Sequence, residues 1–187
     1  MKYIGVFCSA NDLEEKYTTP AKEFAKLMTE HGYNLVWGGS DRGLMRTIAS
    51  AVQDGGGKIV GVTIARYQER ARKNADEMIL ASSLGERKAT ILERSDAIVV
   101  LVGGIGTLDE LSEMLELKKQ GKHNKPIVVL NTDNFYEGIK VQLQKMKDDG
   151  FLNRPLEDFI YFADKPIEAI EYIVRHPGSE ASPGSRG

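Results

Sequence analysis

An unbroken apolar run that ends in a glycine turn is the feature that most limits how this chain can fold. Residues 97–102 (AIVVLV) are all apolar, without the alternation of a half-exposed strand. Such a run is typical of a parallel strand that is covered on both faces. The run breaks at Gly103, Gly104 and Gly106, and leucines then recur at helical spacing over residues 108–115. The segment therefore predicts a buried strand, a tight turn and a helix.

Strand and helix signals alternate along the rest of the chain. Apolar runs predict further strands over residues 3–8, 34–37, 58–64, 77–81, 127–130 and 159–162. Helical spacing follows most of these runs, and Thr18, Thr19 and Pro20 form a start signal for the first helix. Because strands alternate with helices, we expect an α/β fold with a doubly wound, mostly parallel, Rossmann-like sheet in three α/β/α layers.

Length and composition fit one domain. The chain has 187 residues, of which 41% are apolar, which is enough for one sizeable core. We expect a single Rossmann-like nucleotide-binding domain over residues 1–175. The remaining residues 176–187 (HPGSEASPGSRG) have the composition of a disordered tail.

The glycine turn after the buried strand has the features of an anion site, and phosphate is the anion it fits best. Closely spaced glycines bring backbone N–H groups against a ligand, and the positive end of the following helix adds to the attraction. Glu110 lies in the first turn of that helix. A purely local role is the alternative, because Thr107 and Glu110 have the spacing of a capping box. Taken alone, that spacing favours the local role.

Two cations before the buried strand favour a site. Ser83 and Glu86 also have capping-box spacing, which places Arg87 and Lys88 close to the beginning of a helix. Cations there oppose the helix dipole, and residues that break a local rule often serve a site. For Arg87 the site interpretation is favoured over a solvated side chain. For Lys88 the solvated interpretation is favoured, with substrate binding as the alternative.

These motifs together resemble those of the LONELY GUY family of phosphoribohydrolases, whose members are also labelled lysine decarboxylase-like. The family carries MHxRK on one helix and PGGxGTxxE after the next strand. Arg87 and Lys88 match the first motif. The second motif is matched by Gly103, Gly104, Gly106, Thr107 and Glu110. The order and the separation of the two motifs also agree.

A second glycine turn follows the predicted strand at 34–37. Its residues Gly38, Gly39 and Gly43 resemble the family segment GGGxxGLMG, from which Ser40 and Arg46 depart. The carboxyl ends of strands in such a sheet are where ligands bind. We therefore expect Gly39, and Ser9 in the loop after the first strand, to contact substrate. A role of the glycines in turn geometry and helix packing is nearly as well supported.

The resemblance implies a reaction, which is hydrolysis of the N-glycosidic bond of a nucleoside 5′-monophosphate. The substrate would be of the AMP or cytokinin riboside monophosphate type, and the products a free base and ribose 5-phosphate. Such a reaction needs stabilisation of an oxocarbenium-like cation, a positioned water and a firm hold on the phosphate. We assign Glu110 to water activation and cation stabilisation, and Arg87 to orientation of the ribose or phosphate. The glycine turn and Thr107 would bind the phosphate.

Some positions depart from the family pattern. Val102 stands in place of proline, Gly85 in place of histidine and Leu84 in place of methionine. These changes leave the preferred base open. The alternative function is a carrier without catalysis, similar to the molybdenum cofactor carriers that share this fold. A carrier would need the phosphate loop but not the Arg87 and Glu110 pair. The resemblance further implies a homodimer.

Several classes of protein are excluded by missing signals. A net charge of −2 argues against a nucleic-acid partner. His31, His123 and His176 are far apart, so we expect no metal site, and the single Cys8 reads as a core thiol. No G-x-G-x-x-G follows the first strand and no Walker A or G-x-S-x-G pattern occurs, so we expect no dinucleotide or other cofactor. The lack of a long apolar segment or signal peptide predicts a cytoplasmic protein without membrane contact.

The segment 66–74 is rich in arginine and lysine and lacks an apolar face. Most such runs are simply solvated, and this interpretation is favoured. A flap over the phosphate site is the alternative.

Overall fold

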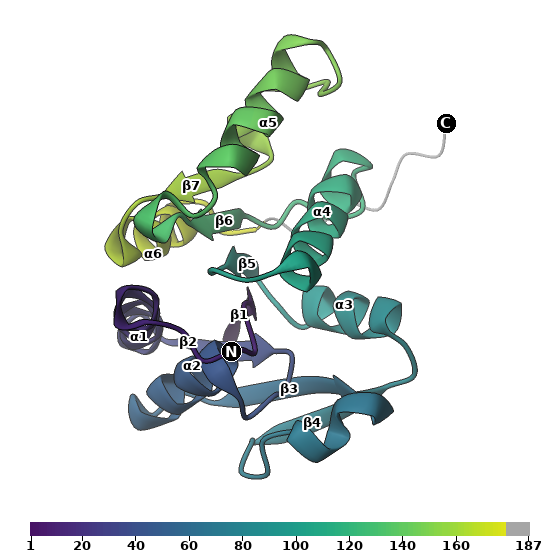
Figure 1. The fold of residues 1–187 in the computed structure, drawn as a ribbon. Helices are drawn as coiled ribbons and strands as arrows, with labels where there is room; N and C mark the ends of the chain where they lie inside the picture. The colour runs from purple at the N-terminus through teal and green to yellow at the C-terminus, as the bar shows by residue number, and fades with distance from the viewer. Residues whose placement is uncertain (179–187) are drawn as a thin grey trace.

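Seven parallel strands form the centre of the molecule in the computed structural model, which describes residues 1–178 (Figure 1). The strands are β1 (Lys2–Phe7), β2 (Tyr33–Trp37), β3 (Ile59–Ile64), β4 (Glu77–Ala81), β5 (Ala97–Val100), β6 (Ile127–Leu130) and β7 (Tyr161–Ala163). Their order in the sheet is β4-β3-β2-β1-β5-β6-β7, and every pair of neighbours is parallel. The predicted doubly wound, Rossmann-like sheet is therefore confirmed.

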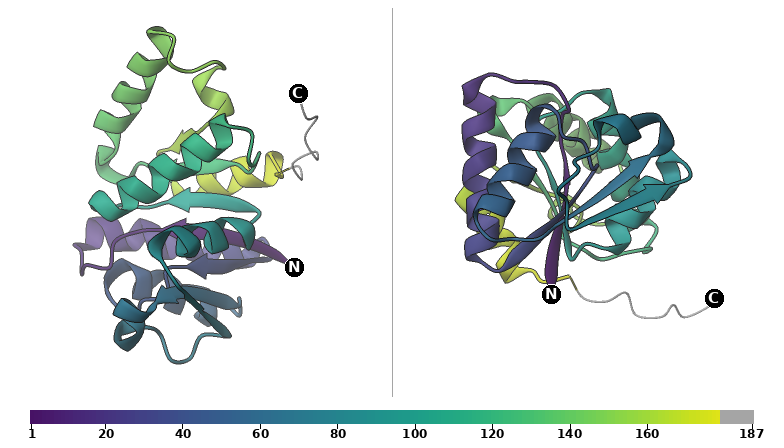
Figure 2. Two further views of the ribbon diagram at one scale, coloured as in Figure 1. Left: turned by 90° about the vertical axis from the view of Figure 1, so that its right-hand side faces the viewer. Right: turned by 90° about the horizontal axis from the view of Figure 1, so that it is seen from below.

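Helices cover both faces of the sheet. They are α1 (Glu15–Glu30), α2 (Gly43–Asp54), α3 (Leu84–Glu93), α4 (Ile105–Lys119), α5 (Glu137–Asp148) and α6 (Pro166–Arg175). There are also three short 3-10 helices, η1 (Ala65–Arg70), η2 (Thr132–Asn134) and η3 (Leu156–Asp158). Buried side chains of α1, α2 and α6 belong to one apolar cluster and those of α3 and α4 to another, so the three predicted layers are present (Figure 2). Within residues 1–178, none of the helices has the length and apolar character needed to cross a membrane.

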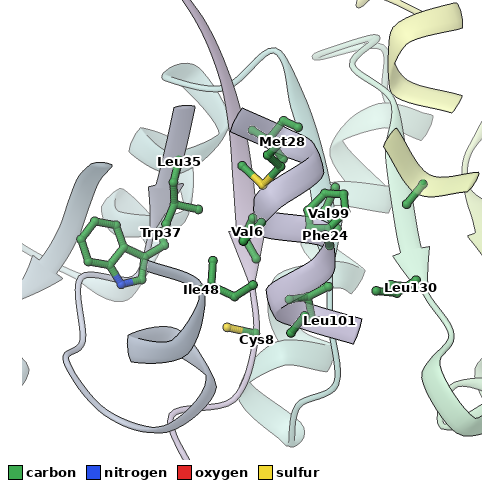
Figure 3. Packing of buried hydrophobic residues seen from close by; sticks show 14 of the residues in the cluster. Val6, Cys8, Phe24, Met28, Leu35, Trp37, Ile48, Val99, Leu101 and Leu130 are labelled. Carbon is green, nitrogen blue, oxygen red and sulfur yellow. The ribbon is translucent and has the colours of Figure 1, made fainter. Parts of the chain in front are cut away.

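The two apolar clusters explain why the central strands lack alternation. In β1, Ile4 and Val6 face the cluster under α1, and Phe7 faces the opposite one. On the first face, Phe24 and Met28 of α1 pack over the sheet (Figure 3). Each such large side chain contributes roughly 1.5–3 kcal/mol when it is fully buried. A strand that is buried on both faces can use apolar residues at every position, as the run at 97–102 does.

The predicted start of the first helix is wrong, and the capping box given as an alternative at the glycine turn does not form. The first helix begins at Glu15, so Pro20 lies inside it rather than at its first turn. The edge-on contact between Tyr17 and Phe135, with ring centroids 5.9 Å apart, gives this extra turn a partner that the local sequence does not reveal. The helix after the glycine turn begins at Ile105 with Gly104 as its N-cap residue. Thr107 is therefore not a capping residue, and no capping box engages Glu110.

Residues 179–187 of the predicted tail lie outside the residues that the structure describes.

More important for function is the point where the strand order reverses. The chain leaves β1 toward β2 on one side and later leaves β5 toward β6 on the other, so the loops at the carboxyl ends of β1 and β5 diverge. Such a switch point is where ligands bind in open α/β sheets. The N–H of Ser9 donates to the carbonyl of Val102 at 3.1 Å and holds the two loops together.

Candidate active site

A cavity of about 430 Å³ lies at this switch point, within the size range of small-molecule sites. Loops after β1, β2 and β5 and the first turns of α3 and α4 form its wall. The predicted site residues in the wall are Ser9, Arg87, Lys88, Gly104, Gly106, Thr107 and Glu110. Gly39 and Gly103 are not among the residues that line it. Sequence segments up to a hundred residues apart thus meet around one space.

Arg87 and Glu110 form a buried ion pair in the wall of this cavity. Nη1 of Arg87 lies 2.9 Å from Oε1 of Glu110, and both residues are only 7% exposed. Nε of Arg87 also donates to the carbonyl oxygen of Val62 at 2.9 Å. Because two of its nitrogens each donate to a separate acceptor, the guanidinium is fixed in orientation. The pair is therefore a preorganised charge site and not two solvated side chains.

Opposing effects act on the pKa of Glu110. Burial raises the pKa of the Glu110 carboxyl above its ordinary value, and the positive charge and hydrogen bond of Arg87 only partly oppose this. Asp109 raises the pKa of Glu110 further, and Lys88 lowers it. A buried carboxyl with a raised pKa beside a fixed cation can accept a proton from a bound water.

Lys88 is buried rather than solvated, so the favoured sequence interpretation of this residue is wrong. It is 8% exposed, and its Nζ lies 2.8 Å from Oδ2 of Asp109 and in contact with Glu113. Burial disfavours the charged ammonium, but the hydrogen bonds and charges of the two carboxylates outweigh burial and raise the pKa of Lys88. Lys88 therefore stays charged and ties α3 to α4 beside the cavity.

The first turn of α4 supplies the anion-binding features that the sequence predicts. Gly104 is the N-cap residue, and the N–H groups of Ile105 and Gly106 are among those for which the helix offers no acceptor. Thr107 is buried, and Gly103 lets it approach, since a Cβ on Gly103 would lie 2.1 Å from Oγ1 of Thr107. Gly103 thus shapes the turn, whereas Gly104 and Gly106 face the cavity.

The β1 loop is held in place by contacts with the start of α2. The carbonyl of Ser9 accepts from the N–H of Met45 at 3.2 Å, and Oγ of Ser9 accepts from the N–H of Asn11 at 3.0 Å. Gly43, with a φ of 53°, packs so closely on this loop that a Cβ would lie 2.2 Å from the carbonyl oxygen of Asn11. Gly39, with a φ of 75°, serves the turn that precedes α2.

Cavity residues that the sequence analysis missed come from the second glycine turn and the following cation-rich segment. They are Ser40, Arg42, Met45, Tyr67 and Arg70, together with Asp109 beside Glu110, whereas Gly38, which also lines the cavity, belongs to the predicted second glycine turn. An antiparallel bridge between Ser40 and Ala71 places the segment after β3 next to the turn after β2. This long-range pairing, together with the hydrogen bonds of Asp41 to Arg70 and of Arg72 to Gly39, holds the segment beside the cavity, and no spacing in the sequence signals it.

Cys8 lies at the floor of the cavity and is also part of the core. It is 2% exposed, and its position beneath Val6 and beside Ile48 and Leu101 is visible in Figure 3. Burial and the nearby charge of Glu110 raise the pKa of the thiol far above its ordinary value, which keeps it protonated. The predicted packed thiol is confirmed. Among residues 1–178, no group of three or more His, Cys, Asp or Glu side chains is placed to hold a metal ion.

Comparison with known proteins finds one matching family model and several similar enzymes. A family model described as "Possible lysine decarboxylase" matches residues 45–173. The cytokinin riboside 5′-monophosphate phosphoribohydrolase of Mycobacterium tuberculosis is 33% identical over 169 residues, which cover 89% of this chain and 90% of that protein. An Arabidopsis thaliana enzyme of the same name is 32% identical over 180 residues, which cover 92% of this chain and 84% of the relative.

Solved structures agree on the fold. The molybdenum cofactor binding protein of Rippkaea orientalis has a TM-score of 0.73 at 20% identity, covering 93% of this chain and 96% of that one. A molybdenum cofactor carrier protein of Chlamydomonas reinhardtii has a TM-score of 0.71 at 24% identity, with the same coverage. At these identities the likeness concerns the fold alone. The family match and the relatives show that the chain belongs to the lysine decarboxylase-like family, the LONELY GUY family that its motifs resemble.

Proposed function

We propose that this protein hydrolyses the N-glycosidic bond of a nucleoside 5′-monophosphate and releases a free base and ribose 5-phosphate. The observation that carries the proposal is the buried Arg87–Glu110 pair, which lies in one cavity with the glycine turn that begins α4. A carrier would need only the turn. The names of the relatives, which are phosphoribohydrolases at about a third identity over most of their length, support the same reaction.

In this proposal the bond between C1′ of the ribose and the base nitrogen breaks as the oxygen of a water bonds to C1′. The bonding electrons leave with the base, and positive charge develops on the ribose, where the Glu110 carboxylate stabilises it. The proton of the water passes to Glu110, and the base takes up a proton, so water is the only co-reactant. Arg87 holds the carboxylate in place and contacts the ribose or phosphate.

The phosphate would lie at the first turn of α4. Backbone N–H groups at Gly104 and Gly106, the hydroxyl of Thr107 and the positive end of the helix are the groups that would hold it. Lys88 would add positive potential, and Ser9 would contact the substrate from the opposite loop. Gly103 and Gly39 would act through the shape of their turns.

Incubation with AMP and detection of free adenine test the reaction. Glu110→Gln keeps the shape of the side chain but cannot take up the proton, so we expect its turnover rate to fall by about 10²- to 10⁴-fold. Glu116→Gln is the matched control, because it makes the same change on an exposed face of the same helix. Its rate should equal that of the unmodified protein.

Two results would overturn this function. One is full activity of Glu110→Gln at unchanged thermal stability. The other is binding of AMP by the unmodified protein without release of adenine, which is the behaviour of a carrier.

We further propose that residues 1–175 form one domain, that two copies assemble as a homodimer, and that the protein acts in the cytoplasm without nucleic-acid partners. The continuous sheet with a core on each face supports the first point. Family resemblance supports the second, together with the apolar side chains of Leu84 and Ile105, which are 49% and 81% exposed beside the cavity. The net charge of −2 fits the absence of nucleic-acid binding.

A further inference from the structure

A second cavity of about 320 Å³ adjoins the first and has an excess of free positive charge. Arg42 and Arg70 line both cavities, and Lys73 lines the second. All three side chains are exposed, and within residues 1–178 none of them makes an ion pair or a hydrogen bond. The charges of Arg46 and Arg87, by contrast, are each balanced by a carboxylate.

The carboxylates of this second cavity do not neutralise these cations. Asp41 is already bound to the side chain of Arg72, with Nη1 and Oδ1 2.7 Å apart. Within the described part of the chain, Glu69 is then the one carboxylate lining this cavity that can balance the three unpaired cations. In the first cavity, Glu110 and Asp109 are likewise engaged by Arg87 and Lys88.

The wall that carries these cations is anchored to the body of the protein. The N–H of Asp41 donates to the carbonyl of Arg70 at 2.7 Å, and the N–H of Arg72 donates to that of Gly39 at 2.9 Å. The guanidinium of Arg72 also bonds to Oε1 of Gln53 on α2 through two nitrogens, at 3.0 and 2.8 Å. The segment after β3 is therefore tied to the turn after β2, with Arg70 of the segment and Arg42 of the turn at the border of both cavities.

We propose that the two cavities form one elongated site for a nucleoside 5′-monophosphate whose base carries a carboxylate-bearing substituent. The inference rests on the proposed function, which places the 5′-phosphate at α4 and the ribose at Glu110. The base then extends toward Tyr67, whose ring offers a stacking surface. A carboxylate beyond the base meets Arg42, Arg70 and Lys73. Guanidinium groups bind carboxylates through paired hydrogen bonds, which an apolar substituent cannot accept.

Equilibrium binding separates this inference from the proposed reaction. Adenylosuccinate carries two carboxylates on the base, AMP carries no substituent, and isopentenyladenosine monophosphate carries an apolar one. Titrated into the Glu110→Gln protein, adenylosuccinate should bind about five- to tenfold more tightly than AMP at low salt, a gain suited to exposed charge pairs. Isopentenyladenosine monophosphate should gain nothing over AMP. The Arg42→Gln/Arg70→Gln double variant should lose the preference for adenylosuccinate.

Lys58→Gln is the control, because it also removes an exposed positive charge but lines neither cavity. Equal affinity for adenylosuccinate and AMP in the parent protein would overturn the inference. A preference that survives in the double variant, or that disappears equally in the Lys58→Gln variant, would do the same. If the unmodified protein shows this preference but cleaves no nucleotide, the subsite stands and the proposed reaction fails.

Discussion

Glu110 is the residue whose protonation state should set the pH dependence of the reaction. The proposed role needs the ionised carboxylate, and burial raises the pKa of this group. Activity is therefore expected to appear only as the pH rises through that raised pKa, at a higher pH than for an ordinary glutamate. The acid limb of kcat/KM for AMP reports this value in the free protein.

Two neighbours of Glu110 should move that limb in opposite directions. Asp109 raises the pKa of Glu110, so Asp109→Asn should shift the acid limb to lower pH. Lys88 lowers the pKa of Glu110, so Lys88→Gln should shift the limb to higher pH. Glu116→Gln, which changes an exposed carboxyl on the same helix, should leave the limb in place. Shifts of the two variants in the same direction would assign the limb to another group.

Gly38 should be required for the position of Arg87. A Cβ on Gly38 would lie 1.8 Å from Nη2 of Arg87, so Gly38→Ala must displace the guanidinium. Because misplacement of a catalytic constellation by about 1 Å can cost on the order of 10²-fold in rate, we expect at least a tenfold loss of AMP turnover. Gly138→Ala is the control, since a Cβ there meets nothing within 4 Å. Normal turnover by a stably folded Gly38→Ala protein would show that Arg87 tolerates displacement.

At the scale of elements, the sequence predicts those units whose signals are local. The buried run of β5, the glycine turn and α4 follow from apolar pattern and glycine chemistry alone. Ser83 is the N-cap of α3 as predicted, and its Oγ accepts from the N–H of Glu86 at 3.1 Å. The carboxylate of Glu86 bonds to Ser82 instead of closing the capping box. Local chemistry thus places the helix but leaves the last hydrogen bond undecided.

The parts that could not be predicted depend on contacts between distant elements. Thr107 and Glu110 have a capping-box spacing, yet Glu110 bonds to Arg87, which lies on α3. Lys88 resembles a solvated lysine until α4 supplies Asp109 and Glu113. In both cases a pairing across two helices overrides a local pattern. A single sequence carries no direct record of such pairings.

The cation-rich segment after β3 shows the same limit on a larger scale. Its cations look solvated in the sequence, and Arg70 and Lys73 are indeed exposed at cavity borders, while Arg72 is held by Asp41 and Gln53. Most of the segment is exposed, as the favoured interpretation expects, but part of it also borders the cavity. Its role follows from the backbone bridge to the turn after β2.

At the scale of the whole molecule, the strand order explains why one site gathers residues from so many segments. Only the reversal between β1 and β5 brings the loop after β1 beside the start of α4. The same geometry leaves Ile105, at the first position of α4, 81% exposed next to the cavity. In the proposed homodimer, a second copy of the chain would cover this side chain.

The proposed homodimer gives a prediction about Ile105. In a two-fold symmetric interface, Ile105→Glu places a charge in both copies of an apolar contact, so sedimentation should show a monomer. A glutamate at the start of a helix is favourable for the helix itself, so unfolding would not explain the change. Phe151→Glu is the matched control, because Phe151 is 71% exposed after α5 and lines no part of the cavity. If the unmodified protein is a monomer, the homodimer is wrong. If only Phe151→Glu dissociates the dimer, the interface lies elsewhere.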